Sequence, residues 1–92
     1  MKVKVEFFAD LRDRIGMVSE VVIFNGVMVI DLIHAVDEKH EGDFKEYVVQ
    51  GTEQKDLVKI LVNGTDIRAL DGLNTPLKEG DVISFFPPIA GG

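Results

Sequence analysis

The chain ends in Gly91-Gly92, and the chemistry open to these residues belongs to the backbone rather than to a side chain. Terminal α-carboxyl groups titrate well below neutral pH, so the carboxyl of Gly92 is expected to be ionised. Such a carboxylate can attack the α-phosphate of ATP, and the resulting anhydride with AMP can react with sulfide, a persulfide or an amine. Glycine has almost no side-chain volume and wide backbone freedom, which suits entry into a narrow tunnel. The sequence therefore predicts that another enzyme activates Gly92.

The residues before the two glycines are suited to present them. Pro87-Pro88 ends a strand-like run, because proline cannot donate a hydrogen bond to a sheet, and is expected to keep the next residues extended. With Ile89-Ala90 and the glycines, this segment can reach roughly 20 Å from the body. We therefore predict a globular domain over residues 1–88 and a flexible tail over residues 89–92.

The amino-acid composition excludes several other types of chemistry and classes of partner. The chain has 92 residues, enough for one domain with a modest core, and 46% of them are hydrophobic. The absence of cysteine excludes a cysteine nucleophile, a disulfide, a side-chain persulfide and an iron–sulfur cluster. The formal net charge of -6 argues against nucleic acid as a partner. No run approaches the ~18 apolar residues of a membrane span and no signal peptide is evident, so we expect a cytoplasmic chain without membrane contact.

Side-chain catalysis and metal binding are not predicted. His34 follows Asp31 by three residues and precedes Glu38 by four, which places all three on one face of a helix. A single histidine between carboxylates on a charged face is more typical of a solvated surface than of a metal site. His40 is explained by the negative end of a helix dipole. We therefore expect neither a bound metal nor a bound cofactor, with ATP being used by the activating enzyme.

The first half of the chain contains two predicted strands and two helical segments. Period-two alternation predicts a strand at residues 2–7 with Val3, Val5 and Phe7 inward. A short helical turn is expected from Ala9 to Ile15, ended by Gly16. A second strand is expected at residues 19–24, with Val21 and Ile23 inward. Apolar spacing then predicts an amphipathic helix from Val29 to His40, with Ile30, Ile33 and Val36 on its buried face and without a good N-cap, since Met28 stands at that position.

The second half is expected to complete a sheet. Asp43 is predicted to cap one helical turn, followed by a surface loop over residues 51–54. The dipeptide Asn63-Gly64 favours a tight hairpin turn in which both residues have positive φ. The strands expected around it are residues 57–62, 66–68 and 82–86. In the last strand, inward Ile83 and Phe85 would place Phe86 on the opposite face. The order of elements predicts a mixed sheet wrapped around one main helix.

The chain resembles the ubiquitin-like β-grasp sulfur carriers of the MoaD/ThiS type, which include the small subunit of molybdopterin synthase and small archaeal modifier proteins. The match spans nearly the whole chain, and its C-terminal block is the most specific part. The residues that carry the resemblance are Phe7-Phe8-Ala9, Leu11-Arg12, Gly16, Val29, Asp31-Leu32, Leu61-Val62-Asn63-Gly64, Leu77-Lys78-Glu79-Gly80-Asp81-Val82 and Phe85-Phe86-Pro87-Pro88-Ile89-Ala90-Gly91-Gly92.

The resemblance implies an α+β fold of the β-grasp type, with about four to five strands around one main helix. It implies that a ubiquitin-activating-type adenylyltransferase adenylates Gly92, and that the product becomes a thiocarboxylate that donates sulfur in molybdopterin synthesis. The large subunit of molybdopterin synthase would then be the second partner and the catalyst. The implied partner-binding residues are Phe86, Pro87, Pro88, Ile89 and Ala90, with Gly91 beside the reactive Gly92.

Two departures from the family pattern and two alternative functions remain. Met28 stands where the family commonly has threonine, and residues 41–56 make the chain longer than thiamine-type carriers, which disfavours thiamine synthesis. In one alternative, Gly92 forms isopeptide bonds with target lysines, as in a small protein modifier. In the other, the domain is a non-covalent β-grasp binding module with an inert tail. The sequence does not separate sulfur transfer from conjugation, nor does it identify the acceptor, the oligomeric state or the order of residues 41–56.

Overall fold

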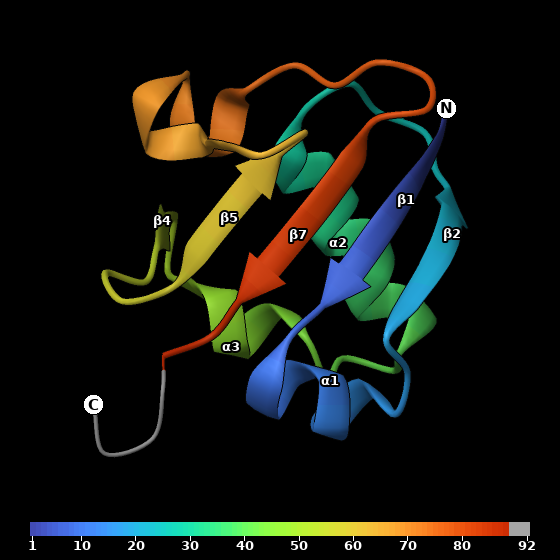
Figure 1. The fold of residues 1–92 in the computed structure, drawn as a ribbon, viewed down its shortest axis with the longest axis vertical. Coiled ribbons are helices and arrows are strands. Elements are labelled where there is room, and N and C mark those ends of the chain that lie inside the picture. Colours follow the sequence, from blue (N-terminus) through green and yellow to red (C-terminus); the bar gives the residue numbers. More distant parts are fainter. Residues whose placement is uncertain (89–92) are drawn as a thin grey trace.

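A computed structural model describes residues 1–88 and shows one mixed sheet packed against one main helix (Figure 1). The main sheet has five strands in the order β2-β1-β7-β5-β6. β1 and β7 run parallel, whereas the other neighbouring strands are antiparallel. The predicted α+β architecture is therefore confirmed. The strand bounds are Lys2–Phe7 for β1, Ser19–Ile23 for β2, Lys59–Val62 for β5, Thr65–Asp66 for β6 and Val82–Phe86 for β7.

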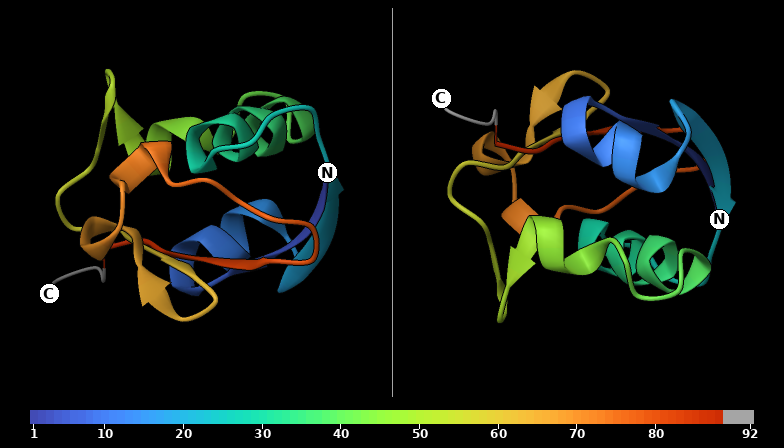
Figure 2. Two further views of the ribbon diagram at one scale, coloured as in Figure 1. Left: turned by 90° about the horizontal axis from the view of Figure 1, so that it is seen from above. Right: turned by 90° about the horizontal axis from the view of Figure 1, so that it is seen from below.

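The helices lie in two places relative to the sheet (Figure 2). α1 lies at one end of β1, and α2 and α3 form a second layer behind the sheet. The longest helix, α2, has 11 residues, and no helix within residues 1–88 combines the length and apolarity needed to cross a membrane. The remaining bounds are Ala9–Ile15 for α1, Val29–Lys39 for α2, Lys45–Val48 for α3, Val49–Gln50 for β3 and Glu53–Gln54 for β4, with 3-10 turns at Ile67–Ala69 and Gly72–Asn74.

The core fills the space between the sheet and α2. The inward residues of β1 are those predicted, and Ile83 and Phe85 of β7 face them with no exposed surface. Three phenylalanines meet edge to face at its centre, where Phe44 lies 5.9 Å from Phe7 and 5.0 Å from Phe85 between ring centroids. On α2 the fully buried residues are Val29, Leu32, Ile33 and Val36, whereas Ile30, predicted to be buried, is only partly so.

The predicted inward face of β2 is wrong. Val22 is 2% exposed and faces the core, while Val21 is 51% and Ile23 78% exposed. The cause is the register, because Val22 lies opposite Val3 of β1, and directly opposed residues in an antiparallel pair share a face. Since β2 has aliphatic residues on both faces, its own sequence does not show which face is buried.

The start of α2 is capped from inside the helix rather than by Met28. The Oδ2 atom of Asp31 accepts hydrogen bonds from the backbone N–H groups of Val27 and Met28, each at 3.0 Å. This arrangement requires glycine at position 26. Its φ is +144°, and the Cβ of any other residue would lie 2.5 Å from the Cβ of Asp31. Asp31, an acid in the first turn, thus accepts hydrogen bonds from backbone N–H groups at the start of the helix that the Met28 side chain cannot bind.

Residues 41–56 contain ordered elements, α3 and the β3–β4 hairpin. Asp43 does not cap α3, contrary to the prediction. Asp37 does so instead, with Oδ1 accepting from the N–H groups of Phe44 at 3.1 Å and Lys45 at 2.7 Å. Asp43 pairs with Arg14 of α1 through two bonds of 3.0 and 2.9 Å, and this hydrogen bonding raises the pKa of the Arg14 guanidinium.

The hairpin after β5 is confirmed and its return strand is shorter than predicted. Asn63 and Gly64 have φ values of +49° and +86°, as the tight turn requires. The return strand β6 ends at Asp66, not at residue 68, because Asp66 accepts the N–H of Arg68 at 2.9 Å and starts a 3-10 turn. The strand before the hairpin begins at Lys59, later than the predicted residue 57.

Replacing Gly26 tests the helix cap. Gly26→Ala is expected to lower the free energy of unfolding by about 2–4 kcal/mol, because it adds a steric clash with Asp31 to the strain of a positive φ. Gly42→Ala is the matched control, since Gly42 has φ +85° but no atom within 4 Å of an added Cβ. Its expected cost is about 1–2 kcal/mol from backbone strain alone. Equal urea midpoints for the two variants would contradict the account.

Candidate functional site

The end of β7 presents an aromatic pair on the sheet face away from α2. Phe86 follows the fully buried Phe85 and, as the alternation predicts, lies on the opposite face, where it is partly exposed. Its ring stacks on that of Phe8 with centroids 4.1 Å apart and an interplanar angle of 13°. A partly exposed aromatic pair of this kind can anchor a partner protein.

Phe8 is held in place by backbone contacts at the junction of β1 and α1. Its N–H donates to the carbonyl of Phe85 at 3.2 Å, and its carbonyl accepts from the N–H of Arg12 at 3.3 Å. Ala9 has a φ of +51°, an uncommon conformation for a residue other than glycine, and turns the chain from strand to helix. The position of Phe8 therefore depends on the same β1–β7 pairing that fixes Phe86.

A shallow apolar hollow of about 650 Å³ surrounds Phe86. Leu57 is the most exposed of its large apolar side chains, at 73%. Exposed leucine beside stacked aromatics is the composition expected of a protein-binding surface. We call this surface, together with Phe8, the apolar platform; the residues that line the hollow are Ala9, Leu57, Lys59, Leu61, Phe86, Pro87 and Pro88.

Several platform residues were not predicted from the sequence. Leu61 could have been found, because strand alternation places it opposite to buried Ile60 and Val62. Phe8 belongs to the motif that carries the family resemblance, but its stack on Phe86 depends on the parallel pairing of β1 with β7. The sequence predicts a strand that includes Leu57, and nothing in its local sequence indicates an exposed loop position.

Arg68 holds the loop that carries Leu57. Its guanidinium donates hydrogen bonds to three backbone carbonyls, those of Val58 at 2.8 Å and of Lys55 and Asp56 at 2.9 Å each. Five N–H donors in a rigid fork make arginine suited to such a contact. Arg68 thus fixes one side of the platform without contributing to its apolar surface.

The two prolines after β7 differ in burial. Pro87 is buried and Pro88 is exposed, so Pro87 belongs to the body rather than to a segment held away from it. The predicted site residues Ile89, Ala90, Gly91 and Gly92 lie outside the described residues. Their roles, and the boundary between a 1–88 domain and an 89–92 tail, remain predictions.

Lys39 and His40, at the end of α2, have a structural role. Within residues 1–88, no three histidine, aspartate or glutamate side chains come together in a way that could bind a metal ion. Glu20 of β2, whose side chain is 8% exposed, lies 2.7 Å from His40 Nε2 and 3.2 Å from Lys39 Nζ. This cluster joins β2 to the end of α2.

Comparisons with known proteins give a consistent result. The family model of the ThiS family matches residues 5–92. Small archaeal modifier protein 3 of Haloferax volcanii is 33% identical over 93 residues, which cover both chains completely. A chain in the crystal structure of the BexX/CysO complex of Amycolatopsis orientalis has a TM-score of 0.82 at 30% identity, covering 98% of this chain and 99% of that one. A chain in the complex of subunits 1 and 2 of the molybdopterin-converting factor of Helicobacter pylori has a TM-score of 0.60 at 34% identity, covering both completely.

Two neighbouring phenylalanines on β7 are expected to respond differently to truncation. Phe85→Ala should lower the free energy of unfolding by about 3–5 kcal/mol, because it leaves a cavity in the core. Phe86→Ala removes a stacking contact at the surface and should lower it by about 1 kcal/mol. Urea denaturation measures both. A loss for Phe86→Ala as large as that for Phe85→Ala would show that Phe86 is a core residue.

The Arg68 contact predicts a change in local exchange. Arg68→Gln should speed hydrogen exchange at the amides of Lys55 and Val58 roughly 5- to 150-fold, since three backbone carbonyls lose a charged donor. Arg12→Gln serves as control, because Arg12 is exposed and its guanidinium forms, within residues 1–88, only a 3.7 Å ion pair with its neighbour Asp13. Exchange that is equally slow in both variants would refute the role given to Arg68.

Proposed function

This chain belongs to the ThiS family, and from that premise we propose that it is a cytoplasmic sulfur carrier for molybdopterin synthesis. It is a ubiquitin-like β-grasp protein of the carrier and modifier group. The proposal adds that a ubiquitin-activating-type enzyme adenylates the Gly92 carboxylate, which is then converted to a thiocarboxylate. The observation that carries the proposal is the apolar platform, which ends at Pro87-Pro88, directly before the predicted reactive segment.

The platform supplies what a carrier without catalytic side chains needs. Binding energy gained at Phe8, Leu57 and Phe86 is remote from the reacting atoms, and it can position Gly92 in the active site of a partner. Most binding energy of protein interfaces comes from a few aromatic or apolar anchors in a central patch. In this proposal the partner enzyme catalyses the reaction, and this chain binds the partner and places Gly92 in its active site.

The proposed chemistry balances without a group on this chain. A carboxylate oxygen of Gly92 attacks the α-phosphorus of ATP, the bond to the β-phosphate oxygen breaks, and pyrophosphate leaves. Sulfide then attacks the carbonyl carbon, and AMP leaves with the electron pair of the C–O bond. The product is a thiocarboxylate, and no external electrons are required. If a persulfide is the donor, the acyl disulfide that forms needs a reducing thiol to break its S–S bond.

Two solved neighbours support a second partner. Each was determined with another protein, the BexX/CysO pair in one case and the two subunits of the molybdopterin-converting factor in the other. By analogy, we propose that the thiocarboxylate of this chain is used by a molybdopterin synthase large subunit, with the apolar platform docked on it.

The full-length likeness to small archaeal modifier protein 3 favours a second function. In this reading, a lysine amine of a target protein displaces AMP and forms an isopeptide bond with Gly92. Lys78 is the last lysine or arginine before the end of the chain, so trypsin should leave residues 79–92 as a branch on the modified lysine. Such branches in digests of the native host, absent when the chain lacks Gly92, would establish conjugation; their absence would refute it.

Gly92→Ala tests the proposed activation step. An added methyl group in a tight tunnel costs ~1–3 kcal/mol, so ATP–pyrophosphate exchange by the activating enzyme should slow roughly 5- to 150-fold. The free energy of unfolding should stay unchanged, because the change lies outside the predicted 1–88 domain. Phe86→Ala should instead raise the KM of the activating enzyme for this chain. Normal exchange with the Gly92→Ala variant would defeat the tunnel argument.

A further inference from the structure

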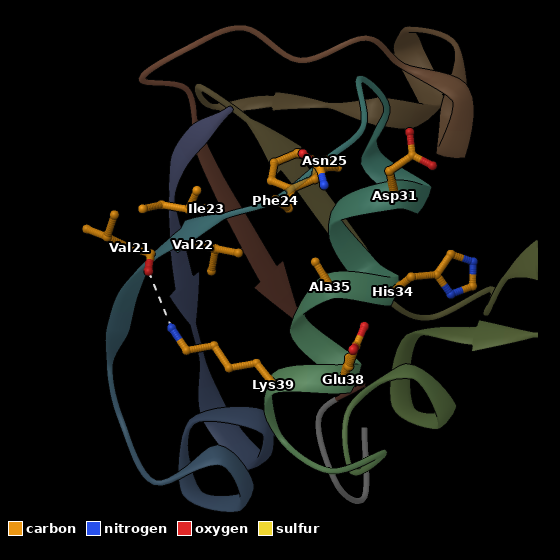
Figure 3. A pocket seen from close by; sticks show the side chains of 10 residues that line it. All are labelled: Val21, Val22, Ile23, Phe24, Asn25, Asp31, His34, Ala35, Glu38 and Lys39. Carbon is orange, nitrogen blue, oxygen red and sulfur yellow. Dashed lines mark hydrogen bonds between the residues drawn. The ribbon is translucent and has the colours of Figure 1, made fainter.

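A second open feature lies at the β2 edge of the sheet. A groove of about 780 Å³ runs between β2 and α2 (Figure 3). It shares no lining residue with the apolar platform, and β1 and β7 separate it from β5. We call it the β2–α2 groove; its lining residues are Val21 to Asn25 on one wall and Asp31, His34, Ala35, Glu38 and Lys39 on the other.

The backbone of β2 directs toward this groove N–H and C=O groups that do not pair with β1. Hydrogen bonds of 3.0 Å from Phe24 N–H to the Met1 carbonyl and 2.8 Å from Phe7 N–H to the Val18 carbonyl show that the even-numbered residues face β1. In an antiparallel pair the alternate residues point the other way, so Val21 and Ile23 direct their N–H and C=O groups outward. The Val21 carbonyl accepts a hydrogen bond of 3.5 Å from Lys39 Nζ of α2, so an added strand has to displace this contact.

The two edges of the sheet differ in how well they are protected from pairing with another chain. Sheet edges are commonly guarded by shortness, proline or charge. The β6 edge is two residues long, whereas β2 has five and exposes both Val21 and Ile23. Glu20, the charged residue within β2, turns inward to His40 and Lys39 and does not guard the edge. Apart from the Lys39 contact with the Val21 carbonyl, the β2 edge is therefore open to an added strand.

The α2 wall of the groove determines the shape and charge of a ligand that can bind there. Ala35 leaves space beside Val22 on the inner side of the groove (Figure 3). Asp31 and Glu38 are seven residues apart on one face of α2, roughly 10 Å along the axis, which is about the length of three strand residues. Glu38 forms no ion pair within residues 1–88, and Lys39 is held by Glu20 at 3.2 Å. The free charge of this wall is thus negative.

We propose that the β2–α2 groove binds an extended segment of a partner protein, an apolar run flanked by lysine or arginine. The segment adds a strand to β2 through the outward backbone groups of Val21 and Ile23. Its apolar side chains pack on these two residues, and its basic ends meet Asp31 and Glu38. Because the groove lies apart from the apolar platform, such a partner can remain bound while the platform is occupied. Binding here does not depend on the proposed carrier chemistry.

A pair of short peptides tests this proposal on the ¹⁵N-labelled full chain. The first is acetyl-Lys-Val-Ile-Val-Lys-amide, whose two lysines lie on the same face of a strand roughly 13 Å apart, and the second replaces both lysines with glutamate. The basic peptide should shift the amide signals of Val21 and Ile23 and slow their hydrogen exchange. The acidic peptide should bind roughly tenfold more weakly, as expected for two surface charge pairs changed to like charges. No shift on β2, or equal binding of both peptides, would overturn the proposal.

Matched variants separate this surface from the rest of the molecule. Glu38→Lys should abolish the preference between the two peptides, because Asp31 stays negative, whereas Glu46→Lys, an exposed change on α3, should leave it unchanged. Phe86→Ala should leave peptide binding intact, so a failed carrier function and a failed groove are distinguishable. Sedimentation of the chain alone should show a monomer. A dimer in which Val21 and Ile23 become protected would assign the groove to a second copy and overturn the proposal.

Discussion

The pairing of β7 on both sides is the constraint on which the rest of the structure depends. β7 runs parallel to β1 and antiparallel to β5, so its register is fixed at every residue from Val82 to Phe86. Burial of Ile83 and Phe85 then determines the face on which Phe86 emerges. The same pairing brings Phe8 against Phe86, and a slip of one residue would exchange the buried and the exposed phenylalanine. The core and the apolar platform are thus two faces of one strand.

This arrangement separates stability from recognition. The fully buried side chains lie between the sheet and α2, while the platform lies on the outer face of the sheet and the β2–α2 groove at the β2 edge, and both contribute exposed apolar surface. Changes at Phe86 or Glu38 can therefore alter binding with little effect on folding. For the carrier function that we propose, such separation would allow one partner to be released while another is engaged.

The main features of the fold could be predicted from local patterns, and the rest depends on contacts distant in sequence. The Asn63-Gly64 turn and the outward Phe86 follow from backbone preference and alternation. The buried face of β2 could not be predicted, because Val21 is as apolar as its inward neighbours and only the register with β1 decides between them. Asp31 as a helix cap depends on a close approach of Gly26. Arg68 acts on carbonyls at least ten residues away in sequence, which no local pattern indicates.

Activation of the Gly92 carboxylate is tested most directly by the intact mass of the full chain after incubation with ATP, a ubiquitin-activating-type enzyme and sulfide. Thiocarboxylate formation should raise the mass by the difference between one sulfur and one oxygen atom, and fragmentation should locate the change at Gly92. The increase should be absent without ATP and strongly reduced for the Gly92→Ala variant. An unchanged mass under conditions in which the enzyme activates a known carrier would contradict the account.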